Sequence, residues 1–174
     1  MRTKTQKLLA AMNVLSWITF IGLMIKAGAI LISYCISMFN PEGSKNLYSG
    51  LDLYGLRQYS FFHYNLNVCL MIALFVLQGY IAFLVIRALS RIKLSNPFTA
   101  ELSKVLEQIS YFMLATWVLA MIFNLQSAWL MKQVSGLREN LISGEFIFLA
   151  GVVFVIAQIF KRGVEIQTEN ELTV

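Results

Sequence analysis

Four long apolar stretches constrain this chain more than any other feature of its sequence. They run over Leu8–Phe39, Leu66–Leu89, Ile109–Met131 and Leu141–Phe160. Because a helix rises ~1.5 Å per residue and bilayer hydrocarbon is ~30 Å thick, a spanning helix needs about 20 mostly apolar residues. Backbone polar groups in lipid must be paired within the segment, which excludes loops. The alternating pattern of membrane strands does not occur. The sequence therefore predicts an all-α integral membrane four-helix bundle.

The composition agrees with a membrane protein and excludes other classes. Of the 174 residues, 58% are hydrophobic and 13% are charged, whereas a soluble domain has about 25% charged residues. Intrinsic disorder requires low hydrophobicity and high charge. Two cysteines are too few for a disulfide scaffold or a cysteine-based zinc site. No nucleophile–base pair, phosphate-binding loop or haem motif occurs, so we expect neither enzymatic activity nor a cofactor.

The distribution of lysine and arginine predicts the orientation of the spans. Nine of the 14 basic residues lie near the N-terminus, around the loop 90–108 and in the tail 161–174. Four lie on the opposite side, in the loop 40–61 and between the third and fourth spans, and Lys26 lies within the first span. Cytoplasmic flanks carry the excess of basic residues, so we expect both termini in the cytoplasm. The pI of 9.3 is then a topology signal, with no direct nucleic-acid binding.

The N-terminal segment has a second interpretation. Its basic start, its apolar run and Ala27-Gly28-Ala29 resemble the three regions of a secretory signal peptide. Lys26 immediately before the cleavage site argues against it, as does the apolar run that continues beyond. We therefore expect the segment to remain as the first span.

The loop 40–61 is the one long external segment that the pattern predicts. It opens with the turn-forming residues Asn40-Pro41-Glu42-Gly43. Leucine and tyrosine are too frequent in the rest of the loop for a fully solvated segment. Aromatic side chains favour the membrane–water interface, so we expect the loop to lie there, with ligand capture as the alternative.

The cytoplasmic loop 90–108 contains start and stop signals for a helix. Pro97 disfavours helix at Asn96, and the Thr99 hydroxyl can cap the helix that follows. A single apolar stripe then follows at helical spacing: Leu102, Val105, Leu106 and Ile109. These signals predict a short amphipathic helix running into the third span. Its apolar face suits the membrane surface or, alternatively, the groove of a partner protein.

The segment Asn96-Pro97-Phe98-Thr99, between a basic turn and a span, resembles a motif of a bacterial family of four-helix membrane proteins, domain of unknown function 2975. The C-terminal stretch from Ala157 to Gln167 resembles that family more strongly. The resemblance covers nearly the whole chain and implies a multi-pass protein of the bacterial inner membrane. The family has no characterised activity, so no catalytic residue is carried over. Its genes frequently lie beside small helix-turn-helix regulators of the Cro-repressor type, which implies a membrane component of a regulatory pair.

Two charged residues within the spans are candidates for function, because buried charges in a membrane are costly. Lys26 either reaches the outer interface or, in another register of the long first span, lies near mid-membrane. Glu145 enters the fourth span from the outside, where it either pairs with Lys26 or lies at headgroup level. Amide side chains within the spans are predicted to hydrogen-bond between helices: Asn13, Gln78, Asn124, Gln126 and Gln158. The one histidine, His63, makes no metal site.

Two functions of different classes follow from these residues. In the first, the cytoplasmic face binds or restrains a helix-turn-helix regulator, and the lipid bilayer is the other partner. The candidate partner-binding residues are Asn96, Pro97, Phe98, Thr99, Leu102, Leu106, Arg162, Glu165 and Glu169. In the second, the protein is a small transporter or channel subunit that uses Lys26 and Glu145.

The tail 161–174 has its own alternative. Its acidic residues with spaced apolar neighbours suit a basic protein partner. Equally, the tail can fold back on the helix that begins at Thr99, with Glu165 and Glu169 near Lys93 and Lys104.

Overall fold

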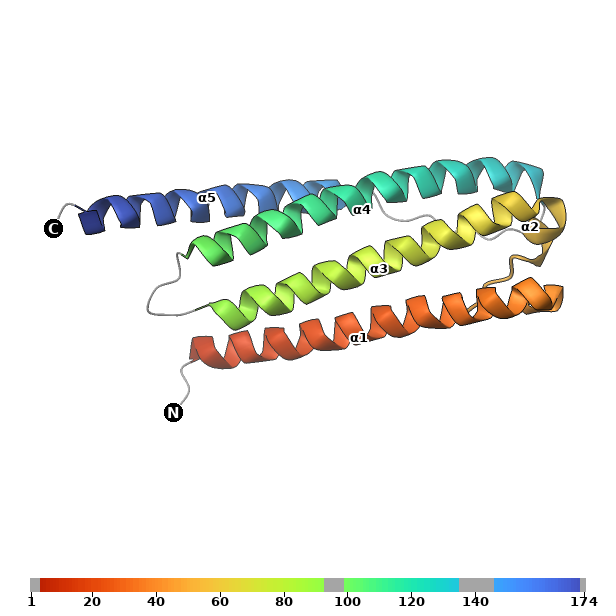
Figure 1. Cartoon of the computed structure of the whole chain (residues 1–174), viewed down its shortest axis with the longest axis horizontal. Helices are drawn as coiled ribbons and strands as arrows, with labels where there is room; N and C mark the ends of the chain where they lie inside the picture. The colour runs from red at the N-terminus through yellow and green to blue at the C-terminus, as the bar shows by residue number, and fades with distance from the viewer. Residues whose placement is uncertain (1–3, 93–98, 135–145, 173–174) are drawn as a thin grey trace. The chain divides into compact units, whose positions relative to one another are not determined.

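The computed structural model describes residues 4–92, 99–134 and 146–172, and every regular element in them is helical. Figure 1 shows these helices along the chain. Their bounds are α1 Lys4–Phe39, a 3-10 turn Pro41–Lys45 (η1), α2 Tyr54–Tyr59, α3 Phe61–Arg91, α4 Ala100–Gln133 and α5 Phe146–Leu172. The all-α prediction is thus confirmed for the described part of the chain.

Three helices are long and apolar enough to cross a membrane: α1, α3 and α4. Each of them contains one of the first three predicted spans. Helix α1 begins before its span and ends with it, whereas α3 and α4 extend beyond their spans at both ends. This pattern indicates a membrane protein. The fourth predicted span starts at Leu141, and its first five residues lie outside the described part, so that span stays a prediction.

The amphipathic segment that begins after Thr99 is helical and runs into the third predicted span, as the sequence predicts. Residues 100–133 form one continuous helix, α4. The sequence contains no glycine or proline between Thr99 and Ile109, so nothing interrupts the backbone hydrogen bonds where the amphipathic stripe meets the apolar span.

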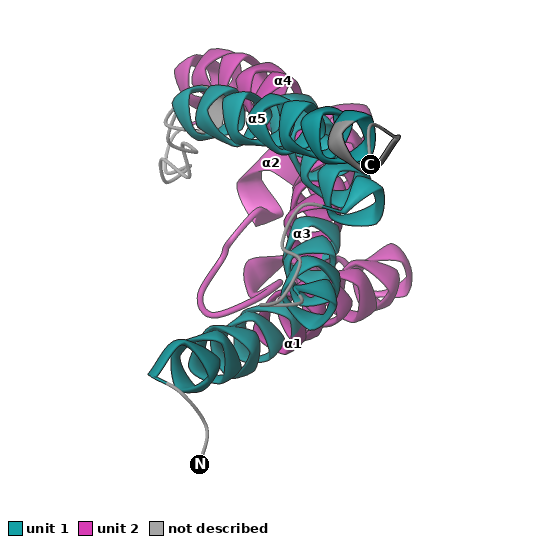
Figure 2. Cartoon of the chain, turned by 90° about the vertical axis from the view of Figure 1, so that its left-hand side faces the viewer, with its two compact units in different colours: residues 1–20, 80–115, 145–174 teal, residues 21–79, 116–144 magenta. Residues whose placement is uncertain are grey.

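Two compact units share the long helices, and Figure 2 colours them separately. Unit 1 comprises residues 1–20, 80–115 and 145–174. Its core joins the end of α3 to the start of α4 and to α5, through Leu84, Ala88, Leu102, Val105, Ile109, Met113 and Ala150. Within this unit α5 runs antiparallel to α4, because Ser103 contacts Ala157 and Tyr111 contacts Phe154.

Unit 2 comprises residues 21–79 and 116–144. Three leucines of the loop after α1, Leu47, Leu53 and Leu56, are almost fully buried in its core. They contact residues of α1, α3 and α4, among them Ile30, Tyr64, Val68, Met71, Leu74, Phe123 and Leu130. These three leucines are therefore covered by the protein's own helices, whereas the position of the loop at the membrane interface stays a prediction.

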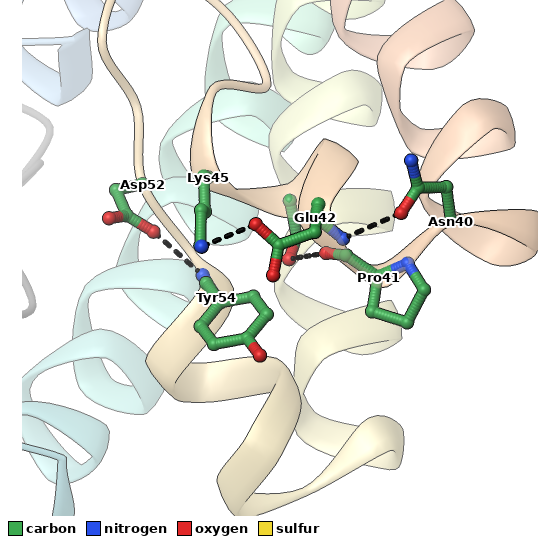
Figure 3. Close-up of polar contacts among 7 residues, drawn as sticks. Asn40, Pro41, Glu42, Lys45, Asp52 and Tyr54 are labelled. Atoms are coloured by element: carbon green, nitrogen blue, oxygen red, sulfur yellow. Dashed lines mark hydrogen bonds and ion pairs between the residues drawn. The ribbon is translucent and has the colours of Figure 1, made fainter.

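Local hydrogen bonds hold this loop in place, as Figure 3 shows. The Asn40 side chain accepts the backbone N–H of Glu42 at 3.1 Å and so caps η1. The Asp52 carboxylate accepts the N–H of Tyr54 at 2.9 Å at the start of α2. Lys45 forms an ion pair with Glu42 one turn away. These contacts pair the polar groups of the turns while the leucines between them enter the core.

Candidate functional site

The Lys26 ammonium lies against aromatic rings within unit 2. Its Nζ is 4.3 Å from the centre of the Phe75 ring on α3 and 5.7 Å from the centre of the Tyr48 ring in the loop. The side chain is half-buried. A cation over a ring face is stabilised by about 0.5–2 kcal/mol, so these rings partly replace water around the charge. Glu145 lies outside the described residues, and its pairing with Lys26 stays a prediction.

Hydroxyl groups join α1 to α3 in the same unit. The side-chain oxygens of Ser37 and Tyr64 lie 2.6 Å apart, and both residues are fully buried. The Tyr34 hydroxyl donates to Asn65 Oδ1 at 3.2 Å. Sequence reasoning assigned no interhelical hydrogen bond to any of these residues. The available signal was the spacing of Ser33 and Ser37, which places two small hydroxyls on one face of the first span.

The amides predicted to bond between helices have a different outcome. Asn13 Oδ1 on α1 and Gln126 Nε2 on α4 are buried without a hydrogen-bond partner among the described residues. Asn124 does have an interaction. Besides Asn65, which accepts from Tyr34, Asn67 makes an interhelical amide contact in unit 2: its Nδ2 donates to Ser127 Oγ at 3.5 Å. At that distance the bond is weak.

Aromatic and basic side chains gather at the corner between α2 and α3. Cζ of Arg57 lies 5.7 Å from the centre of the Phe61 ring and 6.0 Å from that of Tyr64. The His63 ring lies 5.2 Å from the Trp129 ring of α4. Its Nδ1 is 2.9 Å from the Ser60 hydroxyl. Aromatic residues are therefore concentrated at this end of α3, and Tyr64 among them is buried.

Thr99 caps α4 as the sequence predicts. Its hydroxyl accepts the backbone N–H of Leu102 at 3.2 Å. Glu101, in the first turn, forms an ion pair with Arg91 at the end of α3. This pair connects the two ends of the loop in unit 1. Among the residues predicted for partner binding, Asn96, Pro97 and Phe98 lie outside the described residues.

Two residues predicted for partner binding belong to the protein's own core instead. Leu102 is 3% exposed and contacts Leu84 and Ala88 of α3 within the core of unit 1. Leu106 is half-buried against the same core. The apolar stripe is thus real, but α3 and α5 cover it, so Leu102 is not a surface residue.

The C-terminal part of α5 carries the remaining predicted residues. Arg162 Nη1 donates to Glu165 Oε2 at 2.8 Å on the same helix, and both side chains are well exposed. This hydrogen bond raises the pKa of the Arg162 guanidinium above its ordinary value. Gly163 lies inside α5, where a helical glycine costs about 1 kcal/mol relative to alanine.

The described residues contain no group of three or more histidine, cysteine, aspartate or glutamate side chains able to hold a metal ion. Two groups of charged side chains stand out among the described residues. In unit 2, Lys26 and Arg57 lie over aromatic rings, and in unit 1 the C-terminal part of α5 carries exposed charged side chains.

The family comparison agrees with the resemblance that the sequence motifs indicated. The model of the family described as "Protein of unknown function (DUF2975)" matches residues 5–174. No curated protein and no solved structure matches the chain. Because the match covers nearly the whole chain, the protein belongs to this family.

Proposed function

We propose that this member of the DUF2975 family is a four-span protein of the bacterial inner membrane that holds a small helix-turn-helix regulator at its cytoplasmic face. Three helices long and apolar enough to cross a membrane support the membrane placement. Residues 146–160 of α5 are uncharged and supply most of the fourth span. The excess of basic residues on one side supports cytoplasmic termini.

The observation that carries the proposal is the length of α5 beyond its contact with α4. Ser103, three residues after the start of α4, contacts Ala157 of α5 at 3.5 Å. From Ala157 to the end of α5 at Leu172 the helix runs about 22 Å, whereas α4 extends only about 5 Å in that direction. The last turns of α5 therefore extend past the start of α4.

The chemistry of this helix end suits a basic partner. Ile166 is 46% exposed, and Glu165 and Glu169 are exposed beside it. An exposed isoleucine flanked by carboxylates fits the positive face of a DNA-binding domain, since complementary charge directs the encounter and an apolar contact adds affinity. Acidic residues gain nothing from an anionic membrane surface. The resemblance to the family, whose genes neighbour such regulators, points to the same partner.

Co-purification tests the proposal. The chain is expressed in its membrane with the helix-turn-helix regulator encoded beside it, extracted in mild detergent and captured by a tag at its N-terminus. The regulator is expected to co-purify with the full chain. It is expected to be lost from a chain lacking residues 167–174 and from the Ile166→Ser variant. Neither change touches the described core, so both proteins stay folded.

Lys104→Gln is the matched control, because Lys104 is an exposed residue of α4 near the same end of unit 1. Co-purification is expected to survive this change. Retention of the regulator by the truncated chain and by Ile166→Ser would place the contact elsewhere and overturn the proposal.

A small transporter or channel subunit is the second candidate. It is favoured by two buried amide atoms that have no hydrogen-bond partner among the described residues, Asn13 Oδ1 and Gln126 Nε2, in helices that are mostly apolar. Unpaired polar groups inside a membrane protein commonly mark a path for polar solutes. Ion flux into liposomes containing the purified chain, compared with the Gln126→Leu variant, tests it: flux absent from both rejects the transporter.

A further inference from the structure

The Arg57 side chain occupies an unusual position for a cation in this protein. It projects from the last turn of α2 towards the first turn of α3, with its Cζ 5.7 Å from the Phe61 ring centre and 6.0 Å from the Tyr64 ring centre. The side chain is half-buried. Both rings lie within about 6 Å of the guanidinium, the range in which a cation is attracted to an aromatic face.

The charge of Arg57 is not neutralised by any described residue. The described ion pairs join Lys45 to Glu42, Arg91 to Glu101, and Arg162 to Glu165. Nε of Arg57 is also buried and has no hydrogen-bond partner among the described residues. A buried donor on a charged group without an acceptor loses its hydrogen bonds to water and gains none in return, which is destabilising. This corner therefore lacks an anionic acceptor.

The surface around Arg57 is apolar and aromatic. Tyr59, Phe61 and Phe62 are 47%, 50% and 69% exposed. Large exposed rings of this kind favour the membrane–water interface, where they contact lipid on one side and water on the other. The end of a membrane-crossing helix is where such an interface lies.

The length of α3 places this corner at the level of the lipid headgroups. With 31 residues, α3 is about 46 Å long, which exceeds the ~30 Å of hydrocarbon. The predicted span begins at Leu66, so the first turn of α3 lies before it, outside the hydrocarbon. The anion common to all phospholipids at that level is the phosphodiester, and the planar fork of arginine matches two phosphate oxygens.

We infer that Arg57 binds the phosphate of a phospholipid headgroup, with the exposed rings of Tyr59 and Phe62 against the glycerol and upper acyl chains. The lipid phosphate pairs with the half-buried guanidinium, whose charge no described ion pair neutralises. This inference requires the membrane placement of α3 and is independent of any regulator bound through α5.

Lipid retention tests the inference. The purified chain is stripped of lipid in detergent, titrated with phosphatidylglycerol, and the bound lipids are counted by native mass spectrometry. Arg57→Gln is expected to weaken the tightest lipid-binding step about tenfold, as loss of a charge-assisted hydrogen bond does. Arg57→Lys keeps the charge but lacks the planar guanidinium, so its lipid affinity is expected to lie between those of the unsubstituted chain and Arg57→Gln. It provides a second test if the glutamine variant misfolds.

Lys45→Gln is the matched control, because Lys45 is an exposed cation of the same loop that is already paired with Glu42. Its lipid binding is expected to equal that of the unsubstituted chain. Circular dichroism verifies that each variant remains helical. Equal lipid retention by the unsubstituted chain and both Arg57 variants would overturn the inference.

Two further arms identify the anion. Excess inorganic phosphate is expected not to displace the lipid, since the rings bind only a headgroup attached to an acyl chain; displacement would assign the site to a soluble anion instead. Glu139→Gln tests a carboxylate of the chain itself that lies outside the described residues. It is expected to leave lipid binding unchanged, and a tighter lipid complex in this variant would identify Glu139 as the native acceptor.

Discussion

The side-chain oxygens of Ser37 and Tyr64 lie 2.6 Å apart and join α1 to α3 in a fully buried hydrogen bond. Ser37 also donates to the carbonyl of Tyr34 at 2.7 Å. Since the Ser37 proton is used in that bond, the Tyr64 hydroxyl is the donor between the helices. Because Tyr64 donates and Ser37 accepts, substituting one residue leaves a different buried group without a partner than substituting the other.

Removing the acceptor is expected to cost more than removing the donor. Ser37→Ala leaves the Tyr64 hydroxyl buried and unpaired, a loss of about 1–3 kcal/mol in the free energy of unfolding. Tyr64→Phe removes only the net value of a hydrogen bond, about 0.5–1.5 kcal/mol. Reversible unfolding in mixed micelles measures both. The double variant is expected to be no less stable than Ser37→Ala alone; strictly additive losses would contradict the shared bond.

The contact between Lys26 and Phe75 predicts an energetic coupling. In the cycle of Lys26→Met and Phe75→Leu, we expect a coupling of about 0.5–2 kcal/mol in the free energy of unfolding, because the ring stabilises the ammonium. Phe62→Leu is the control, because Phe62 is an exposed ring in the first turn of α3. We expect no coupling between Lys26→Met and Phe62→Leu. A parallel cycle with Glu145→Gln measures the ion pair that the sequence predicts. Coupling to Glu145 and none to Phe75 would mean that the carboxylate, not the ring, holds the charge.

The cap at the start of α4 predicts a local loss of stability. Thr99→Ala removes the acceptor of the Leu102 N–H and is expected to cost about 0.5–2 kcal/mol. Hydrogen exchange in the first turn of α4 is expected to accelerate before exchange elsewhere. Thr99→Ser retains the hydroxyl and is the matched control. An unchanged rate of hydrogen exchange in Thr99→Ala would show that the Arg91–Glu101 ion pair stabilises this turn without the cap.

The ion pair in the loop after α1 predicts a titration shift. A hydrogen bond to Glu42 holds the pKa of Lys45 above its ordinary value of 10.5. The Lys45 ammonium is therefore fully charged below pH 10.5, and the ion pair is lost as the pH rises through the raised pKa. Glu42→Gln is expected to lower the pKa of Lys45 towards 10.5, measured by NMR of isotope-labelled lysine. Both side chains are exposed, so we expect little change in stability; an unmoved pKa would exclude the pair in solution.

The proposed topology predicts the compartments of two positions. Reporter fusions at Ser49 and after Val174 are expected to lie in the periplasm and the cytoplasm, respectively, because basic residues favour the cytoplasmic flanks. Finding both fusions in one compartment would reject four spans. A mature N-terminus at or beyond Gly28 would instead establish the signal peptide that Lys26 argues against.

Apolar run length and start signals in the sequence determined the helices and part of their ends. The stretches with few charges became α1, α3 and α4 because unpaired backbone groups are as costly in lipid as in a protein core. The Thr99 hydroxyl placed the start of α4 within one residue, since a cap acts through its immediate neighbours. The motifs near Thr99 and in the C-terminal stretch also sufficed to identify the family.

Only the tertiary structure decided what each apolar or charged side chain contacts. Leu56 and Leu102 are buried by the protein's own helices, although hydropathy placed one at the membrane interface and the other on a partner or the membrane surface. Lys26 meets aromatic rings from two distant segments, Tyr48 and Phe75. The physical reason is that lipid and a protein interior are both apolar. Hydropathy therefore predicts that a side chain is removed from water. Only the packing between distant helices decides whether it contacts lipid or other residues of the protein.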